Sequence, residues 1–568
     1  MKQADTFEQI TETGIRHKNT TLLDISLSPV MAMGTAHVQQ DICDRDVDSF
    51  TVSPEQVPAE QERVERAMVE AAAELRDSVA RIEAALDPAS AAIFQAHRQI
   101  LQDSGLKDEI RHEIAKHRIN AEDVVQRTFR RWEQSFRSKG SEIPQERAAD
   151  LRDIGRLLLR NLAGLKLHSL EAIPERSVLV ARRLLPSVTI FFPRRKVAAV
   201  LTEHGGPGSH PALLTRQIGI PGVCSNPQLL ERVASGDEVA VDGLRGTVLI
   251  APDETRRAQF RAEMERYRTS LAVAMRRRHE PAVTRDGVRI PVFANIGSRA
   301  DAELAVENGA EGVGLFRIEL LFLTHETLPS EEELHEELRQ AIEPVTGRPM
   351  VIRLLDIGGD KQLPYLRHPL EANPSLGQRG VRLLLHYPEL LRLQLRVLLR
   401  LSREFELRLL IPMVAVPEDV AQVRTEMDRV AAELSLSRVP ELGAMVETPA
   451  AALNVRALLE HADFINIGTN DLTQYSLAAD RENVLVADYF RHDHEVIFWL
   501  LHLETSDAGS RQVGVCGELA GQLDAFPRLL QAGVRMLSVA PALIPSVKEA
   551  VRTCTASGSN PGAESEKS

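Results

Sequence analysis

Cysteine is scarce in this sequence, with four residues in 568. Cys43, Cys224, Cys516 and Cys554 lie far apart and form no CxxC pair. We therefore expect neither a disulfide framework nor a cysteine-based zinc site, because both need cysteines at recurring or paired spacings. The scarcity favours the reducing environment of the cytoplasm.

Long hydrophobic runs and an excess of positive charge are also missing. No uncharged stretch is long enough to span a bilayer, and residues 1–5 do not begin the basic-then-apolar pattern of a signal peptide. The formal net charge is −13, from 81 acidic and 68 basic residues, whereas nucleic-acid binding needs a net basic face. We expect a cytoplasmic protein with no nucleic-acid partner and no membrane partner.

The distribution of apolar residues predicts several domains, which a chain of this length can accommodate. The two ends, residues 1–24 and 556–568, are polar and are expected to be flexible or disordered. A charged helical linker is predicted over residues 252–284. Residues 57–166 predict a helical bundle, because apolar residues recur at helical spacing, as in the stripes Val64, Met68, Leu75, Val79, Ile82, Leu86 and Leu151, Ile154, Leu158, Leu162.

Short apolar runs that flank this helical segment predict strands. One run precedes it and four follow it: Thr35–Val38, Ser177–Ala181, Val197–Leu201, Glu238–Val241 and Thr247–Ile250. The last two surround Asp242–Gly246, whose sequence DGLRG is typical of a hairpin turn. These runs predict a small α/β domain over residues 25–56 plus 167–251, with the helices inserted in it.

Residues 285–555 alternate between strand-like and helical segments. Eight units over this length match the size of a (β/α)₈ barrel, although alternation alone would suit an open doubly wound sheet equally well. The polar residues that follow the strands favour the barrel. The eight runs are Val288–Asn295, Gly312–Arg317, Met350–Leu355, Leu407–Met413, Leu442–Val446, Phe464–Ile467, Gln512–Val515 and Met536–Val539.

Arginines, carboxylates and one thiol follow the ends of these strands, where barrel enzymes carry their catalytic groups. They are Arg317, Glu319, Arg353, Asp356, Glu447, Asn470, Asp471, Arg481, Cys516 and Glu518. Arginine forks suit a small anion that carries carboxylate or phosphate oxygens. Carboxylates among them would repel that anion unless a divalent cation bridged the two, so Glu447 and Asp471 are predicted to hold Mg²⁺. Cys516 is either a proton donor or a small buried hydrophobic residue.

A glycine-rich turn carries the second chemical feature. Residues 203–216 read EHGGPGSHPALLTR and connect a predicted strand to a predicted helix. Backbone N–H groups exposed in such a turn can bind an anion, and His210 would bring an imidazole nucleophile to it. A histidine after a glycine turn is more often a cap or a loop residue, so the turn alone leaves this role open.

Taken together, these motifs resemble those of Enzyme I of the bacterial phosphotransferase system, a phosphoenolpyruvate-protein phosphotransferase. The resemblance runs in one order from about residue 25 to 550. It is carried by GAEGVGLFR (309–317), RLLDIGGDK (353–361), NPSLGQRGVR (373–382), MVETPA (445–450), IGTNDLTQY (467–475) and CGELAG (516–521).

The resemblance implies a fold and a set of roles. The fold would combine a C-terminal TIM-like barrel with a swivelling α/β phosphohistidine domain that carries an inserted helical bundle. Phosphoenolpyruvate would bind in the barrel, and Mg²⁺ would be held by Glu447 and Asp471. His210 would accept the phosphoryl group, Arg379 would support it during transfer, and Cys516 would protonate the enolate to give pyruvate. The implied substrate-binding residues are Arg317, Arg353, Asn470, Asp471 and Arg481.

The resemblance also implies partners. An HPr-like phosphocarrier protein would dock on the helical insertion and accept the phosphoryl group, which is the first step of sugar uptake by this system. The barrel would form a homodimer.

The sequence departs from the family at the histidine turn, which usually reads GGRTSHT. Pro207 and Gly208 replace the arginine and first threonine, and Pro211 follows His210. These changes leave open a catalytically weak regulatory relative that binds partners without efficient turnover. A second alternative, a nucleotide-dependent dikinase, needs an ATP-grasp domain for which the sequence before the first predicted strand has no room.

Overall fold

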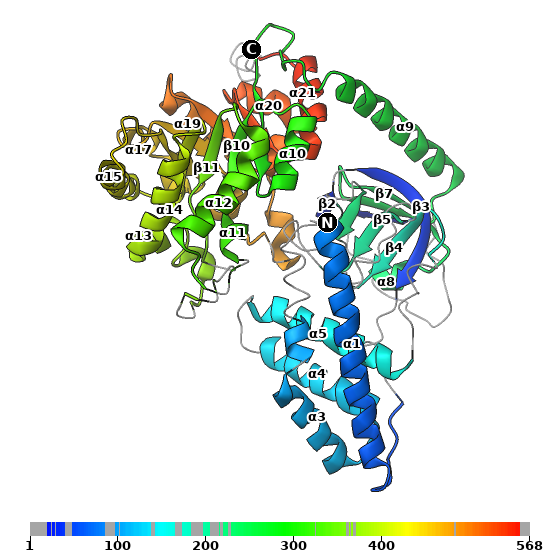
Figure 1. The fold of residues 1–568 in the computed structure, drawn as a ribbon. Coiled ribbons are helices and arrows are strands. Elements are labelled where there is room, and N and C mark those ends of the chain that lie inside the picture. Colours follow the sequence, from blue (N-terminus) through cyan, green and yellow to red (C-terminus); the bar gives the residue numbers. More distant parts are fainter. Residues whose placement is uncertain are drawn as a thin grey trace, which may run out of the picture. The chain divides into compact units, whose positions relative to one another are not determined.

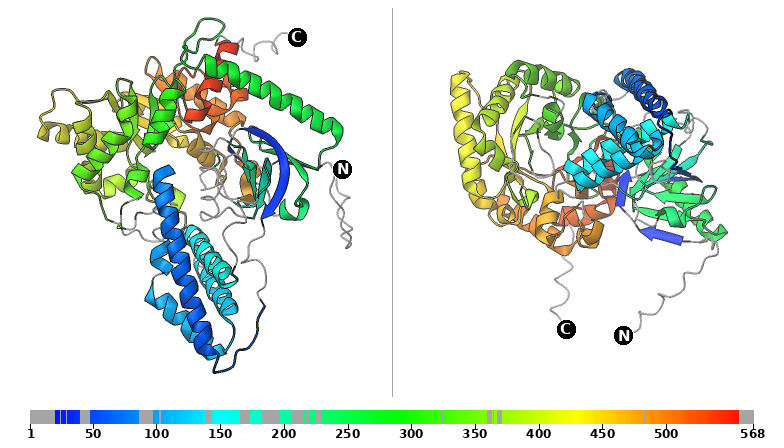
Figure 2. Two further views of the ribbon diagram at one scale, coloured as in Figure 1. Left: turned by 45° about the vertical axis from the view of Figure 1, so that its right-hand side comes forward. Right: turned by 90° about the horizontal axis from the view of Figure 1, so that it is seen from below.

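The computed structural model of the chain divides into two compact units, Met1–Phe50 with Gly155–Tyr267, and Thr51–Ile154 with Arg268–Ser568. The ribbon drawings show their helices and strands (Figures 1 and 2). The structure describes residues 20–23, 25–28, 30–39, 48–85, 97–101, 103–137, 143–164, 173–182, 197–204, 215, 220–224, 229–323, 325, 327–358, 363, 365–366, 371–481 and 484–556.

In the first unit, eight strands of the described residues form one mixed sheet in the order β1-β8-β7-β3-β4-β5-β6-β2. Strands β3 to β6 pair in parallel, and the pairs β1–β8, β7–β8, β3–β7 and β2–β6 are antiparallel. The strands are β1 Thr20–Leu23, β2 Ile25–Ser28, β3 Met31–Gln39, β4 Ser177–Ala181, β5 Val197–Thr202, β6 Gly222–Cys224, β7 Glu238–Asp242 and β8 Thr247–Ile250.

Apolar side chains cover both faces of this sheet. Along β7, Val239 and Val241 belong to one core cluster, which includes Leu229 of the short helix α8 (Leu229–Arg232). Ala240 belongs to a second cluster with Phe260 and Met264 of helix α9 (Glu254–Arg276). Alternate residues of one strand thus enter opposite cores, as the two-residue period of a strand requires. Within residues 252–284, predicted as a charged helical linker, α9 is helical over Glu254–Arg276 and residues 277–284 are not helical.

The five strands predicted for this unit are present, and the predicted hairpin joins β7 to β8. Strands β1, β2 and β6 were not predicted. Strand β1 lies inside residues 1–24, which we expected to be flexible, and pairs with β8 from Thr20 opposite Ile250. Ordered backbone therefore begins earlier than the sequence indicated. The rest of the predicted flexible ends, residues 1–19 and 557–568, lies outside the described residues.

Helices α1 (Val57–Ala85), α3 (Ser104–His117), α4 (Ala121–Arg137) and α5 (Ile143–Leu162) lie between β3 and β4 in the chain. Helix α1 packs against α3 and α4, which also pack against each other. Where their side chains are described, the predicted stripes are buried at Val64, Met68, Leu75, Leu151, Ile154 and Leu158, whereas Leu162 is half-buried. The side chains of Val79 and Ile82, and Leu86, lie outside the described part.

The second unit contains a closed barrel of eight parallel strands. Its strands are β9 Val292–Ile296, β10 Val313–Arg317, β11 Met350–Arg353, β12 Leu407–Val414, β13 Leu442–Val446, β14 Phe464–Ile467, β15 Val513–Val515 and β16 Leu537–Val539. Pairing of β16 with β9, which places Leu537 opposite Val292, closes the ring. The structure therefore confirms the predicted barrel and excludes the open doubly wound sheet.

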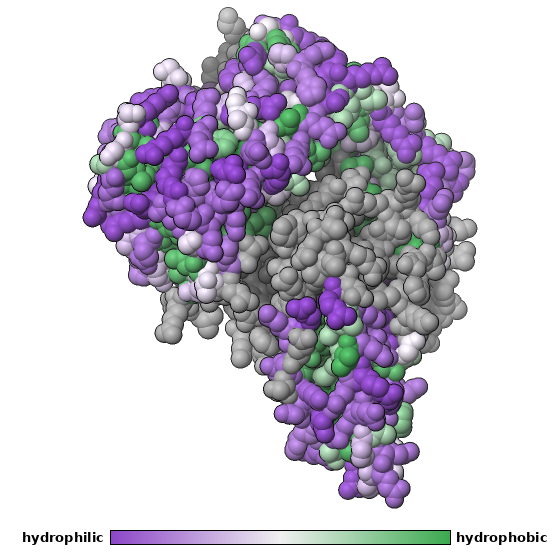
Figure 3. Space-filling view, viewed as in Figure 1, coloured by the Kyte–Doolittle hydropathy of each residue, from purple (hydrophilic) through white to green (hydrophobic). Residues whose placement is uncertain are grey.

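Helices surround the barrel between successive strands. They are α10 Arg299–Glu307, α11 Glu319–Leu323, α12 Glu331–Ile342, α13 Val381–His386, α14 Pro388–Leu401, α15 Pro417–Glu433, α16 Pro449–Ala452, α17 Val455–Leu458, α18 Thr469–Leu477, α19 Glu495–Ala508, α20 Phe526–Gln531 and α21 Ile544–Thr553. The visible outer face of the barrel is largely hydrophilic (Figure 3). Among the described residues, no helix combines the length and the apolar character that crossing a membrane would require.

The barrel interior is filled by side chains. Leu315, Val351, Leu410, Met445, Phe464 and Cys516 form a core cluster of their own. The packing is close, because a Cβ atom built on Gly443 would lie 2.4 Å from the Phe464 ring. The side-chain amide of Asn295 adds two hydrogen bonds inside the barrel, to the backbone carbonyls of Cys516 at 3.0 Å and Ser538 at 3.1 Å. The interior is thus a packed core, so any substrate must bind at an end of the barrel.

This packing makes the interior sensitive to truncation. We expect Leu410→Ala to lower the free energy of unfolding by about 2–5 kcal/mol, because it opens a cavity at a fully buried site. The matched control is Leu453→Ala, at a side chain that is 58% exposed, with an effect within about 0.5 kcal/mol. Urea unfolding followed by circular dichroism measures both. Equal effects of the two substitutions would contradict the filled interior.

Candidate active site

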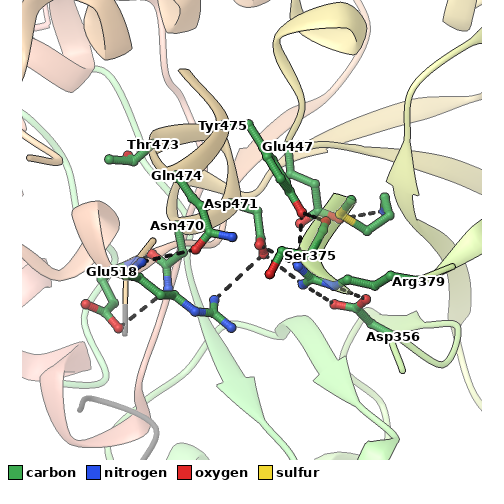
Figure 4. A network of polar contacts seen from close by, with 12 residues as sticks. Asp356, Ser375, Arg379, Glu447, Asn470, Asp471, Thr473, Gln474, Tyr475 and Glu518 are labelled. Atoms are coloured by element: carbon green, nitrogen blue, oxygen red, sulfur yellow. Dashed lines mark hydrogen bonds and ion pairs between the residues drawn. The ribbon is translucent and has the colours of Figure 1, made fainter. Parts of the chain in front are cut away.

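The residues predicted to carry the chemistry lie where the barrel strands end, as their parallel arrangement requires. Arg317 and Arg353 are the last residues of β10 and β11. Glu447 and Cys516 follow β13 and β15 by one residue. The remaining residues come from loops and helix starts on the same side: Asp356, Arg379, Asn470, Asp471 and Arg481. Figure 4 shows the polar contacts of Asp356, Arg379, Glu447, Asn470 and Asp471.

A buried chain of alternating charges begins at Glu319, in the first turn of α11. Glu319 Oε1 accepts from Arg353 Nη2 at 2.8 Å and from the backbone N–H of Asp356 at 3.1 Å. Asp356 Oδ2 lies 3.0 Å from Arg353 Nη1. Burial works to lower the pKa of Arg353, but the charges of Glu319, Asp356 and Glu447 outweigh it and raise that pKa. Arg353 therefore remains a cation inside the protein.

Arg379 continues this chain and uses its whole hydrogen-bonding capacity (Figure 4). Its Nε and Nη2 atoms donate to Asp356 Oδ1 and Oδ2, both at 3.0 Å. Nη1 and Nη2 donate to Asp471 Oδ1 at 2.8 Å and Oδ2 at 3.1 Å, and Nη1 also donates to the Tyr475 hydroxyl at 3.4 Å. These five bonds match the five N–H groups of a guanidinium.

Asp471 ends the chain next to Arg481. Arg481 Nη1 lies 3.8 Å from Asp471 Oδ2, and the Arg481 backbone N–H donates to Gln474 Oε1 at 3.2 Å. Burial works to raise the pKa of Asp471, but the charges of Arg379 and Arg481 outweigh it and lower that pKa. Asp471 is therefore a carboxylate at neutral pH.

Glu447 has the opposite electrostatic character. Its side chain is fully buried, and one oxygen, Oε1, accepts from the backbone N–H of Met413 at 2.6 Å. The other oxygen, Oε2, is buried without any hydrogen-bond partner in the described structure. Burial, followed by the charges of Asp471 and Asp356, raises the pKa of Glu447 to about 8, against the opposing effect of Arg353 and Arg379.

The Met413 backbone is bent to reach Glu447. Met413 has φ 56°, in the left-handed region that few side chains adopt, and the register of β12 with β13 shifts between Ile411 and Val414. Such irregularities in strands are frequent beside active sites, where they redirect a group. Gly380 fits against the bend, because a Cβ atom there would lie 2.7 Å from Met413 Cβ. This contact could not be predicted from the sequence, because nearly every residue type carries a backbone N–H.

The donor set fits a hard divalent cation. Glu447 offers a buried oxygen without a partner, and Asp471 offers a carboxylate. The charge of Asp471 raises the pKa of Glu447, so the two groups belong to the same site. The described residues contain no cluster of three or more metal-ligating side chains. Mg²⁺ is commonly bound through one or two carboxylates, with substrate oxygens and water supplying the other ligands.

Two predicted residues stand apart from the charge chain. Arg317 is exposed and makes no ion pair with any other described residue. Cys516 is buried, and its Sγ atom lies 3.4 Å from the Ile467 carbonyl oxygen. Burial and the charge of Glu447 raise the pKa of Cys516 to about 12, against Arg353 and Arg317, which lower it. Its thiol therefore keeps its proton at neutral pH and can act as an acid.

Asn470 is held by Glu518, which the sequence also placed after a barrel strand, and Glu518 in turn lies near His492, which the sequence did not assign to the site. Its Oδ1 atom accepts from the backbone N–H of Glu518 at 2.9 Å, which fixes the amide orientation. His492 Nε2 lies 3.8 Å from Glu518 Oε2, and its Nδ1 atom lies 3.2 Å from Thr473 Oγ1. His494, two residues on, caps α19 by accepting from the Val496 N–H. His492 and His494 are therefore polar residues at the start of α19.

His210 and most of the glycine-rich turn lie outside the described residues. The structure does describe the residues that lead into the turn. Glu203 follows β5, is buried, and accepts from the Leu230 backbone N–H at 2.9 Å and from Arg182 Nε at 3.3 Å. The chain thus enters the turn from a fixed point on the sheet.

The fold and the site define a barrel-type enzyme with a second, α/β unit. Three models of the PEP-utilising enzyme family match this chain. The model of the PEP-binding domain matches residues 272–556, that of the N-terminal domain residues 25–147, and that of the mobile domain residues 173–246. The chain belongs to the PEP-utilising enzyme family.

Curated relatives carry the name phosphoenolpyruvate-protein phosphotransferase. One from Geobacillus stearothermophilus is 38% identical over 499 residues, which is 86% of each chain. One from Haemophilus influenzae is 34% identical over 537 residues, 93% of each chain, and one from Haloferax volcanii is 39% identical over 471 residues, 81% of each. A solved Enzyme I (nEIt) structure aligns with TM-score 0.36 and 28% identity, covering 44% of this chain and 99% of that one.

The raised pKa of Glu447 predicts a pH-dependent stability. Between its ordinary pKa of 4.5 and about 8, the unfolded state loses this proton while the folded state keeps it. The contribution of Glu447 to stability is therefore complete below pH 4.5 and is lost as the pH rises to about 8. Glu447→Gln cannot ionise, so its melting temperature relative to the parent should increase between pH 5 and 8.5.

Calorimetry in the presence of a chelator, which removes divalent cations, measures this difference. The exposed Glu460→Gln serves as the control and should show no such trend. Parallel pH profiles of Glu447→Gln and the parent would contradict the assigned protonation of Glu447.

Proposed function

We propose that this enzyme transfers the phosphoryl group of phosphoenolpyruvate to its own His210 and then to a histidine of an HPr-like phosphocarrier protein, releasing pyruvate. This is the first step of the phosphoenolpyruvate-dependent sugar phosphotransferase system. The observation that carries the proposal is the buried Arg353–Asp356–Arg379–Asp471 chain at the barrel mouth of a PEP-utilising enzyme.

The arginines supply the charge that phosphoenolpyruvate needs. The substrate carries a carboxylate and a phosphate, and both match guanidinium forks. Arg317 has no protein ion pair among the described residues and so has its donors available, while Arg353 and Arg481 border the same end. Asn470 would donate to the substrate from Nδ2, which carries a second N–H besides the one that faces Glu518 Oε1 at 3.5 Å, because its Oδ1 already accepts from the Glu518 backbone N–H.

Glu447 and Asp471 would hold Mg²⁺. The buried Oε2 atom of Glu447 and the Asp471 carboxylate are the oxygen donors, and Glu447 would give up its proton on binding. When bound, the cation supplies positive charge to the phosphate ester and the leaving enolate oxygen.

The reaction then follows from the chain's own groups. The His210 imidazole attacks phosphorus, the bond between phosphorus and the enol oxygen breaks, and Arg379 offsets charge on the transferring phosphoryl group. The enolate takes a proton at its terminal carbon from the Cys516 thiol, which gives pyruvate. The thiolate regains a proton from solvent.

We propose the domain roles in the same terms. Residues 25–56 with 167–251 would form the phosphohistidine domain, which swings on the 252–284 linker between the barrel and the carrier. Residues 57–166 would bind the carrier. The barrel, residues 285–555, would dimerise. Helix α19 offers apolar surface for this contact, because Val496 and Trp499 lie one turn apart and are 39% and 59% exposed. The protein would act in the cytoplasm.

His210 should be the phosphoryl acceptor. Incubation with phosphorus-labelled phosphoenolpyruvate and Mg²⁺ should give an acid-labile, base-stable label on this residue. His210→Ala should abolish labelling yet still bind phosphoenolpyruvate in calorimetry, because the binding residues belong to the barrel. The control His502→Ala changes an exposed histidine of α19 and should label normally.

An unlabelled parent chain would overturn the proposal. With phosphoenolpyruvate binding intact, that result would favour the weak regulatory relative suggested by Pro207, Gly208 and Pro211. Labelling from ATP would instead indicate a dikinase.

Cys516 should act as an acid. Cys516→Ala should slow pyruvate release by roughly 100-fold or more, because the enolate must then take its proton from water. Stopped-flow detection of pyruvate measures the rate, and Cys554→Ala, at the end of α21, is the matched control. An unchanged rate in Cys516→Ala would assign the proton to another group.

A further inference from the structure

Asp356 is the carboxylate that two of the predicted substrate and phosphoryl arginines share. Its Oδ2 atom lies 3.0 Å from Arg353 Nη1 and accepts from Arg379 Nη2 at 3.0 Å, while Oδ1 accepts from Arg379 Nε at 3.0 Å. All three side chains are buried. A carboxylate bonded along one edge of a guanidinium fixes both its plane and its direction, so Asp356 determines how Arg379 is aimed.

Asp356 is itself held from several sides. Its backbone N–H donates to Glu319 Oε1, the same oxygen that accepts from Arg353 Nη2. A Cβ atom built on Gly380 would lie 3.3 Å from Asp356 Oδ1, so only a glycine leaves that carboxylate undisturbed. The backbone hydrogen bond to Glu319, the arginine that both carboxylates share and the close approach of Gly380 together leave Asp356 little freedom to move.

Arg379 can reach a phosphoryl oxygen only by releasing an acceptor, because all five of its N–H groups are engaged. Asp471 is the acceptor suited to leave, since it is a proposed cation ligand and also faces Arg481 at 3.8 Å. Asp356 is suited to stay, since it carries two arginines and its backbone is tied to Glu319.

We propose that Asp356 is a positioning residue that holds Arg379 in the orientation required for phosphoryl transfer, while Arg353 is also held by Glu319. The inference rests on the proposed function. It assigns Asp356 no contact with the substrate and makes its effect depend on Arg379. Removal of Asp356 should therefore harm the reaction only while Arg379 is present to be misplaced.

A double-mutant cycle on the full chain tests this dependence. The measured quantities are the rate of His210 labelling at saturating phosphoenolpyruvate with Mg²⁺ and the half-saturating substrate concentration. We expect Asp356→Ala to lower the labelling rate by about 100-fold, as misplacement of a catalytic group by about 1 Å can do. In an Arg379→Ala background the same change should lower the rate by less than about threefold, because residues that act as a unit are not additive.

The matched control is Asp463→Ala. Asp463 Oδ2 also accepts from an arginine, Arg424 Nη2 at 2.7 Å, and from a backbone N–H, that of Leu442 at 2.8 Å. It directly precedes β14 and so lies at the other end of the barrel. Its removal should leave labelling unchanged. Asp356→Asn keeps the side-chain shape, and its cycle with Arg379→Ala carries the test if Asp356→Ala shows no cooperative melting transition.

The outcomes separate two failures. A parent chain that phosphoenolpyruvate does not label overturns the proposed function and this role together. A labelled parent in which the two substitutions are additive, or in which Asp463→Ala is as harmful as Asp356→Ala, overturns the role of Asp356 alone.

Discussion

The five hydrogen bonds of Arg379 are the interaction on which the barrel mouth depends. They join three segments that are far apart in the chain: the loop after β11, the start of α13 and the start of α18. A buried charge is costly unless it is paired and hydrogen-bonded, and removal of one partner leaves the others uncompensated. The charged residues of this network, from Glu319 to Asp471, therefore depend on one another for their stability. None of them is placed by its own strand alone.

This arrangement separates the protonation states of two carboxyl groups at one site. Asp471 faces Arg379 and Arg481, whose charges keep its pKa low despite burial. Glu447 is fully buried, accepts only a backbone N–H, and lies in the field of two other carboxylates, which raises its pKa to about 8. Environment, rather than residue type, thus gives one permanent anion and one group whose proton a cation can replace. Burial, followed by the charge of Glu447, raises the pKa of the Cys516 thiol, which therefore stays protonated.

The sequence was sufficient to predict the barrel and the set of residues that meet at its strand ends, because both depend on repetition. Eight apolar runs gave the strands, and parallel pairing brings the residues after them to one end. Strand β6, with three residues, was missed because it belongs to no repeating unit, whereas the equally short β15 and β16 continue the alternation of strand and helix. The Met413 N–H was also invisible, because it depends on a left-handed φ rather than on a side chain. Asp356 was visible as a strand-end carboxylate, but its sharing between two arginines is a tertiary property.

Particular polar groups at the two ends of the barrel differ in how completely they are satisfied, although α19 also carries a buried carboxyl group, that of Glu504, without a hydrogen-bond partner among the described residues. At the starts of the strands, Lys548 is buried yet donates to the carbonyls of Arg278 and Gly309 at 2.9 and 2.6 Å, and Asp463 bonds both Arg424 and a backbone N–H. At the strand ends, Glu447 retains a buried oxygen without a partner and Met413 holds a strained backbone. Such defects persist only where the surrounding structure enforces them. The satisfied groups at the strand starts stabilise the barrel, and that stability allows Glu447 and Met413 to keep an unpaired oxygen and a strained backbone at the other end.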